Sequence, residues 1–158
     1  MVLVDEKPKN VMERVKTFED ACNELGIKHD DWVQDKKGLG LEADVIAYLK
    51  LRIIVAALNE GWEPKFTLGE YRWFPWFRLL TKEEIEELDE DEKCRVVGWA
   101  SGSADASGGL VYSDANYVST FSSTYFGSQL ALKSEELAEY AGEQFREIYA
   151  DFCFMSEK

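Results

Sequence analysis

Few residues in this chain have the types and spacing that catalysis needs. His29 is the only histidine, so a histidine-containing triad or a multi-histidine metal site would need a second chain. It lies in the polar segment 28–31, which is typical of a solvated loop. Ser101, Ser103 and Ser107 have neither a Gly-x-Ser-x-Gly pattern around them nor a base to activate them. The sequence therefore predicts no catalytic residue and favours a non-catalytic protein over an enzyme.

Neither a cofactor nor a metal ion is indicated. Cys22, Cys94 and Cys153 are widely spaced, which fits reduced packing residues better than a zinc site or disulfides. Segment 37–41 is the nearest approach to a phosphate-binding loop, but it lacks a preceding strand and the Gly-Lys-Ser/Thr ending. We therefore expect no cofactor and no metal ligand.

Negative charge dominates the composition. The chain has 31 acidic and 18 basic residues, a formal net charge of -13, which would repel duplex DNA and anionic bilayers. Residues 81–93 hold eight acids and two lysines, a pattern typical of a solvated helix face. Asp105 and Asp114 lie among small residues where a carboxylate could be enclosed, although turn and outward strand positions are the simpler interpretation.

An aromatic run at 71–78 is the most unusual feature. Alternation along an extended chain would place rings on both faces. Aromatic rings beside arginines can stack on bases or sugars, or they can anchor a protein partner. The alternative interpretation is that the rings on one face of the strand fill the hydrophobic core. A second group at 112–126 mixes aromatic residues with Ser, Thr and Asn, which suits a contact surface. The candidate binding residues are Tyr71, Arg72, Trp73, Trp76, Arg78, Tyr112 and Tyr117.

The elements that must position these residues follow from periodicity and capping. Apolar spacing of three and four predicts helices over 11–25 and 41–60, joined by a polar stretch at 28–40. A capping box at Thr81 predicts a short acidic helix over 81–93. A serine N-cap predicts a last helix over 134–154.

The middle of the chain reads as strands and turns. Residues 66–80 should be extended, with a bend or an edge at Pro75, and further strands are expected at 95–100, 110–118 and 129–133. We therefore predict an α+β fold in which an antiparallel sheet of three to five short strands has helices packed on one face. A length of 158 residues fits a single domain over 1–158 with frayed ends.

Hydropathy argues against a membrane protein. The longest apolar stretch, 53–58, is far shorter than the roughly 20 residues that cross a bilayer. The first eight residues also lack the apolar run of a secretory signal. We expect a cytoplasmic protein.

Several segments have a recognisable sequence: 57–62, 71–77, 109–112, 128–142 and 148–152. They resemble a family of uncharacterised proteins encoded by phages and prophages of gut Bacteroidales, and the likeness covers roughly residues 41–154. The family has no assigned activity, so the resemblance implies no catalytic or binding residue. It implies a mobile-element protein that acts in the cytoplasm of a bacterial host or within a virion.

The expected function is therefore a non-catalytic interaction protein, such as a virion or assembly component. It would bind a protein partner through an aromatic and Ser/Asn-rich sheet surface, with no binding to duplex DNA or membranes. Single-stranded nucleic-acid binding or glycan binding is the alternative, and a carboxylate-dependent hydrolase or an acidic DNA mimic is less favoured. The sequence leaves open the oligomeric state and which sheet face is exposed.

Overall fold

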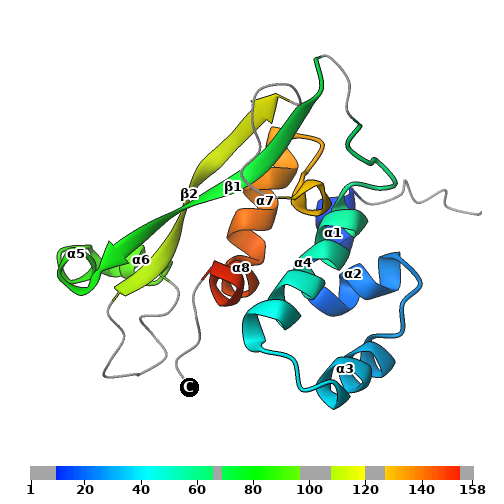
Figure 1. Ribbon diagram of the computed structural model, residues 1–158. Helices are drawn as coiled ribbons and strands as arrows, with labels where there is room; N and C mark the ends of the chain where they lie inside the picture. The colour runs from blue at the N-terminus through cyan, green and yellow to red at the C-terminus, as the bar shows by residue number, and fades with distance from the viewer. Residues whose placement is uncertain (1–9, 66–68, 97–107, 120–126, 154–158) are drawn as a thin grey trace, which may run out of the picture.

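The computed structural model describes residues 10–65, 69–96, 108–119 and 127–153. In this part of the chain a long two-stranded ribbon lies on one side of the molecule and most of the helices on the other, while two short helices lie at one end of the ribbon (Figure 1). Two C-terminal helices lie next to the ribbon, and the N-terminal helices follow beyond them. The fold therefore mixes helices with a two-stranded antiparallel sheet.

Four helices form the N-terminal half, and the first predicted helix is divided. Thr17 accepts a hydrogen bond from the Asp20 N–H while the Asp20 carboxylate accepts from the Thr17 N–H, so this capping box starts a new helix after Val15. The prediction of one continuous helix over 11–25 was therefore wrong, because the helix is interrupted between Arg14 and Phe18. The helices are α1 (Val11–Arg14), α2 (Phe18–Glu24), α3 (His29–Gly38) and α4 (Ala43–Leu58).

Helix α3 occupies the segment expected as a polar connection. None of its residues is buried, so its sequence carries no apolar periodicity to reveal it. It rests on the rest of the protein through Trp32, whose ring centroid lies 4.8 Å from that of Phe18 in α2. Acids in its first turn and lysines in its last turn suit the helix dipole.

Helix α4 is the central helix, as its sequence predicted. Its buried side chains belong to the main hydrophobic core, which also includes Phe74, Leu132 and residues of the C-terminal helices. The buried residues of α4 are Ala47, Leu51, Ile54, Val55, Ala57 and Leu58.

The ribbon consists of β1 (Tyr71–Thr81) and β2 (Gly108–Ser119), paired antiparallel. Trp73 lies opposite Tyr117 and Pro75 opposite Ala115. The register shifts between Trp76 and Phe77, which leaves one residue of β2 unopposed in a β-bulge.

Pro75 is accommodated because its nitrogen faces the outer edge of β1. On that edge the Trp73 N–H donates to the Leu132 carbonyl at 3.0 Å, and the Leu132 N–H donates to the Trp73 carbonyl at 2.9 Å. Backbone groups alternate in direction along a strand, so Pro75, two residues on, also faces away from β2. The proline therefore removes no hydrogen bond between the two strands.

The expectation of three to five strands is not confirmed. The described residues form one sheet of two strands. The expected strand at 95–100 falls mostly on residues 97–100, which lie outside the described part of the chain. The expected strand at 129–133 was wrong, because this segment holds the 3-10 helix η1 (Ser128–Leu130) and then a single bridge from Leu132 to Trp73.

Two other predicted helices are also divided. The acidic segment forms α5 (Lys82–Glu86) and α6 (Glu90–Lys93), because Asp89 makes a second capping box with Glu92. The last segment forms α7 (Glu135–Gln144) and α8 (Arg146–Cys153), which meet at the buried Phe145. None of the helices in the described ranges combines the length and apolar character that a membrane-crossing segment needs.

Helices α7 and α8 cover the middle of the ribbon. Gly142 of α7 is so close that an added Cβ would lie 2.5 Å from the Tyr112 ring and 2.7 Å from the Pro75 Cβ. Phe77 packs against Tyr149 of α8, with ring centroids 5.1 Å apart. Phe74 belongs to the opposite face of β1 from Pro75 and Phe77, and it is also buried. Both faces of β1 are therefore partly covered, and not one face alone.

Candidate functional site

Two half-exposed tyrosines lie side by side near the end of the ribbon where β1 begins. Tyr71 is 50% exposed and Tyr117 is 49% exposed. Their rings meet edge to face with centroids 4.7 Å apart, and the Trp73 ring centroid lies 4.9 Å from that of Tyr117. We call Tyr71, Trp73 and Tyr117 the tyrosine end. Edge-to-face contact is a favoured ring geometry, so the pair is preformed.

The tyrosine end is exposed because the ribbon is longer than the helix that covers it. The 11 residues of β1 span roughly 36 Å at 3.3 Å per residue. The 10 residues of α7 span roughly 15 Å. Both ends of the ribbon therefore extend past the α7 helix.

Other exposed side chains follow along β1. Trp76 is 36% exposed and Arg78 is exposed. Leu79 is 66% exposed, although sequence analysis did not select it. Strand alternation was the only sequence feature that could have indicated Leu79, because it puts residues 71, 73 and 79 on the same face of β1. By the same alternation Tyr71, Leu79 and Tyr117, which pairs with Trp73, share one face of the ribbon, whereas Trp76 and Arg78 belong to the opposite face. We call Tyr71, Leu79 and Tyr117 the ribbon surface.

Arg72 does not belong to this surface. Its side chain is only 11% exposed. Its Nη1 donates to the Ser128 hydroxyl at 2.9 Å, and its Nε lies 4.0 Å from the Glu70 carboxylate without a hydrogen-bond partner. Arg72 therefore fastens β1 to η1 and is not accessible to a large ligand.

Tyr112 is half-buried between the ribbon and α7. Its ring packs edge to face against Phe77, with centroids 6.1 Å apart, and lies against Gly142. Tyr112 therefore belongs to the packing under the ribbon, and the structure does not bring it together with Tyr71 and Tyr117.

An acidic tip follows β1 directly. We define it as residues 82–93, the span of α5 and α6. Ile85 of the tip is fully buried and packs with Leu80 and Val96 in a small cluster of its own. The tip is thereby held against the end of the ribbon beside Leu79.

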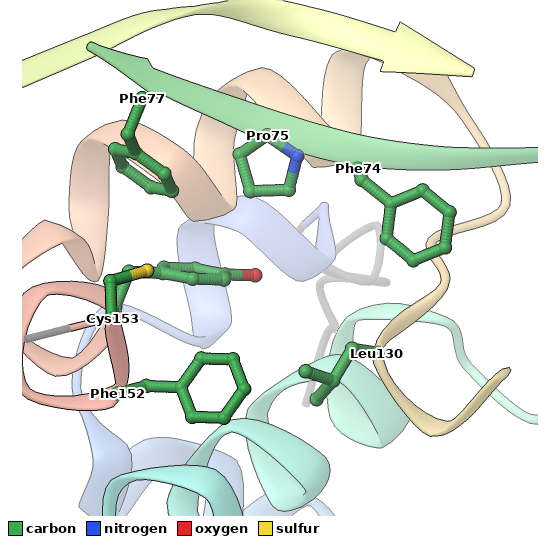
Figure 2. A pocket seen from close by; sticks show the side chains of 7 residues that line it. Phe74, Pro75, Phe77, Leu130, Phe152 and Cys153 are labelled. Carbon is green, nitrogen blue, oxygen red and sulfur yellow. The ribbon is translucent and has the colours of Figure 1, made fainter. Parts of the chain in front are cut away.

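A small cavity lies between β1 and α8 (Figure 2). Phe74, Pro75 and Phe77 of β1 point toward it, together with Leu130 of η1. Tyr149, Phe152 and Cys153 of α8 complete its lining. Its volume is about 10 Å³, which is the room of one water molecule. The cavity is therefore too small for a cofactor.

The polar groups at this cavity are poor candidates for catalysis. The Tyr149 hydroxyl is buried without a hydrogen-bond partner, and burial raises its pKa far above the usual range. Burial also raises the pKa of the Cys153 thiol. A thiolate nucleophile or a tyrosinate base is therefore disfavoured at neutral pH.

The three cysteines are all free, but only one is a buried packing residue. Cys22 is buried in α2, whereas Cys94 and Cys153 are exposed residues. Cys153 is partly enclosed where it lines the cavity, and this partial enclosure is what raises the pKa of its thiol. The expectation of three packing cysteines was wrong for these two, because each lies at the end of a short helix.

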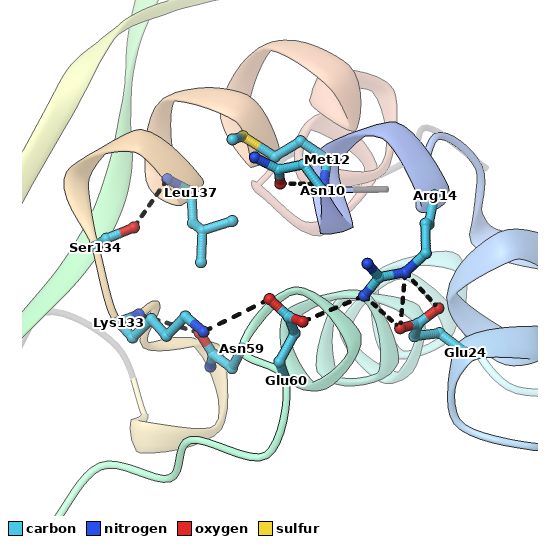
Figure 3. Close-up of polar contacts among 9 residues, drawn as sticks. All are labelled: Asn10, Met12, Arg14, Glu24, Asn59, Glu60, Lys133, Ser134 and Leu137. Carbon is cyan, nitrogen blue, oxygen red and sulfur yellow. Dashed lines mark hydrogen bonds and ion pairs between the residues drawn. The ribbon is translucent and has the colours of Figure 1, made fainter. Parts of the chain in front are cut away.

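Four charged residues from separate parts of the chain form a network of ion pairs (Figure 3). Arg14 contacts Glu24 at 2.8 Å and Glu60 at 3.2 Å, and Glu60 lies 3.8 Å from the Lys133 Nζ. These ion pairs join α1 and α2 to the end of α4 and to the segment after η1. Their role is therefore structural.

The remaining sequence candidates for chemistry do not assemble. The His29 Nδ1 lies 2.9 Å from the Asp30 carboxylate, which is 98% exposed, so this pair is solvated. Ser101, Ser103, Ser107 and Asp105 lie outside the described residues, as does the side chain of Asp114. In the described ranges, no three His, Cys, Asp or Glu residues come together to hold a metal ion.

Comparisons with protein-family models, with curated proteins and with solved structures found no match to this chain.

Proposed function

We propose that this protein binds a protein partner through the ribbon surface. The observation that carries the proposal is the tyrosine end, where Tyr71 and Tyr117 are half-exposed and already packed together. Tyrosine, tryptophan and arginine contribute most to interface energies. Because these rings are ordered before binding, less conformational entropy is lost on association.

Leu79, which is 66% exposed, continues the same face toward the other end of β1. Trp76 and Arg78 are exposed on the opposite face, so they are not part of the proposed docking surface. A partner of ordinary interface size covers about 800 Å² on each side, so one partner can reach much of a ribbon roughly 36 Å long.

The burial of Arg72 favours a protein over single-stranded nucleic acid. Stacking on bases needs nearby positive charge, and of the two arginines in β1 only Arg78 is exposed. The net charge of -13 adds repulsion between the chain and any nucleic acid.

The resemblance to phage and prophage proteins supports the cellular context of the proposal. The partner would be another protein of the phage particle or a protein of the bacterial host cytoplasm. A role as a virion or assembly component is the corresponding proposal for the biological process.

Photo-crosslinking tests the proposal. The photoreactive residue p-benzoylphenylalanine replaces Tyr117, a change that keeps an aromatic ring, in protein produced in cells of the bacterial host. The matched control carries it at Gln34, an exposed position of α3. We expect one defined protein adduct from position 117 and none from position 34, with mass spectrometry identifying the adduct.

The identified partner is then purified and titrated against the unmodified chain. The double variant Tyr71→Ser, Tyr117→Ser should bind at least about tenfold more weakly, as for interface residues of this kind. Equal adducts from both positions, or unchanged affinity of the double variant, would contradict docking at the ribbon surface. Quenching of tryptophan fluorescence by oligonucleotides at low salt would instead support the nucleic-acid alternative.

A further inference from the structure

The geometry points to a cationic partner: we infer that the docking face of the partner combines apolar side chains with lysines or arginines. This inference rests on the proposed docking at the ribbon surface and adds the chemistry of the occupant. It follows from the position of the acidic tip relative to Leu79 and from the charges that the tip leaves without counterions.

The acidic tip is fixed in place by its caps. Thr81 is both the last residue of β1 and the N-cap of α5. Its hydroxyl accepts a hydrogen bond from the Glu84 N–H at 3.3 Å, and the Glu84 carboxylate accepts from the Thr81 N–H at 2.7 Å. With Ile85 fully buried beneath it, the tip and the ribbon end form one ordered unit.

Half of the acids in the tip have no internal role. Glu84, Asp89 and Glu92 accept capping hydrogen bonds, and Glu90 lies 3.7 Å from Lys93. The others are exposed, and no ion pair or hydrogen bond joins them to another described residue. These four acids are Glu83, Glu86, Glu87 and Asp91.

Leu79 places an apolar contact beside this charge. It is 66% exposed and lies two residues before the N-cap of α5. At physiological salt, charges act over a Debye length of about 8 Å. Partner cations would therefore have to lie close to the tip, next to the apolar groups that cover Leu79.

Charge complementarity also argues against two other occupants of the ribbon surface. A second copy of this chain carries the same net charge of -13 and the same acidic tip. Nucleic acid carries negative charge at every phosphate. Like charges brought together across an interface oppose association, whereas a cationic protein surface gains attraction.

Labelled peptides test the inference on the full chain. The main probe is a fluorescein-labelled 12-residue peptide of alternating leucine and lysine, whose extended length is close to that of β1. A leucine–glutamate peptide and a serine–lysine peptide are the comparison probes. At 50 mM salt we expect only the leucine–lysine peptide to bind well, and its affinity should fall as salt is raised.

Two charge-matched variants locate the effect. The tip variant carries Glu83→Gln, Glu86→Gln, Glu87→Gln and Asp91→Asn. The control variant carries Glu136→Gln, Glu139→Gln, Glu143→Gln and Glu147→Gln, which are exposed positions of α7 and α8. The tip variant should bind the leucine–lysine peptide about tenfold more weakly, while the control variant should stay within about twofold.

The outcomes separate this inference from the proposed function. Equal loss in both charge variants, equal binding of the glutamate peptide, or no binding of the leucine–lysine peptide up to about 1 mM would overturn the cationic partner. If binding then still depends on Tyr71 and Tyr117, docking at the ribbon surface stands. Binding that depends on the tip and Leu79 but not on the two tyrosines would support the cationic partner and contradict the tyrosine end.

Discussion

The middle of the ribbon and its ends are built from the same kinds of residue but have opposite surroundings. Phe74 is 2% exposed, whereas Tyr71, on the same strand, is 50% exposed. Helices α7 and α8 and the segment after η1 cover the middle, and the ends extend past them. The difference teaches that the length of the covering helices, rather than the aromatic content of the strand, decides which rings are available to a partner.

Contact distances show how tight the covered region is. Gly142 brings α7 against Tyr112 and Pro75 with no room for a methyl group. Such packing couples the buried side chains in the middle of the ribbon to the stability of the whole fold. Tyr71 and Tyr117 are half-exposed and Leu79 is 66% exposed, so a partner can reach them without disturbing this packing.

Truncating Phe74 should produce the largest effect and the clearest contrast with an end residue. Phe74→Ala removes a fully buried ring from the main core and should lower the free energy of unfolding by about 4 kcal/mol. Tyr71→Ala should lower it by less than about 1 kcal/mol. Urea unfolding followed by far-UV circular dichroism measures both. Similar losses in the two variants would remove the distinction between middle and ends.

Adding one methyl group at Gly142 should have the next largest effect. In Gly142→Ala the new Cβ would meet the Tyr112 ring at 2.5 Å, and overpacking of this kind costs about 2 kcal/mol. Gly38→Ala is the matched control, because no atom lies within 4 Å of its added Cβ. The control should unfold at the same or a slightly higher urea concentration. A stable Gly142→Ala protein would show that α7 does not press on the ribbon.

Replacing Tyr149 should have the smallest effect and the opposite sign. Tyr149→Phe removes a buried hydroxyl without a partner and should raise the free energy of unfolding by about 1 kcal/mol at neutral pH. Destabilisation would instead show that this hydroxyl is satisfied in solution.

The same variant makes a pH prediction. Burial raises the pKa of Tyr149 above its ordinary value of 10.0 in the folded protein, while the unfolded chain keeps the ordinary value. Below pH 10 the hydroxyl keeps its proton in both states, and above pH 10 the unfolded chain loses this proton more readily than the folded protein, so the free energy of unfolding falls as the pH rises further. Urea unfolding between pH 9 and pH 11 should show a smaller loss for Tyr149→Phe than for the parent chain.

Much of the helical structure could be predicted because its signals are local. The apolar face of α4, the capping box at Thr81 and the N-cap at Ser134 are each confirmed. The breaks that divide other predicted helices were missed, although Asp20 and Asp89 carried capping signals of their own. Helix α3 was missed because a helix without buried residues shows no apolar stripe.

Exposure at the candidate site could be predicted only in part. Of the seven residues selected from the sequence, Tyr71, Trp76, Arg78 and Tyr117 are exposed and Trp73 is half-buried. Arg72 and Tyr112 are covered through Ser128 and Gly142, which are distant from them in sequence. Leu79 was missed for the same reason, since only the reach of the helices leaves it uncovered.

The amino-acid sequence by itself determined the charge, the extended aromatic segment and four of the eight α-helix starts in the described residues, those of α1, α4, α5 and α7. These depend on composition or on contacts between residues only a few positions apart, such as Thr81 with Glu84. Only the tertiary structure decided which aromatic rings are exposed. Burial of these rings depends on where α7 and the segment after η1 contact β1, which lies more than 50 residues earlier in the chain. A pattern of residue types along the sequence does not specify where such distant segments make contact.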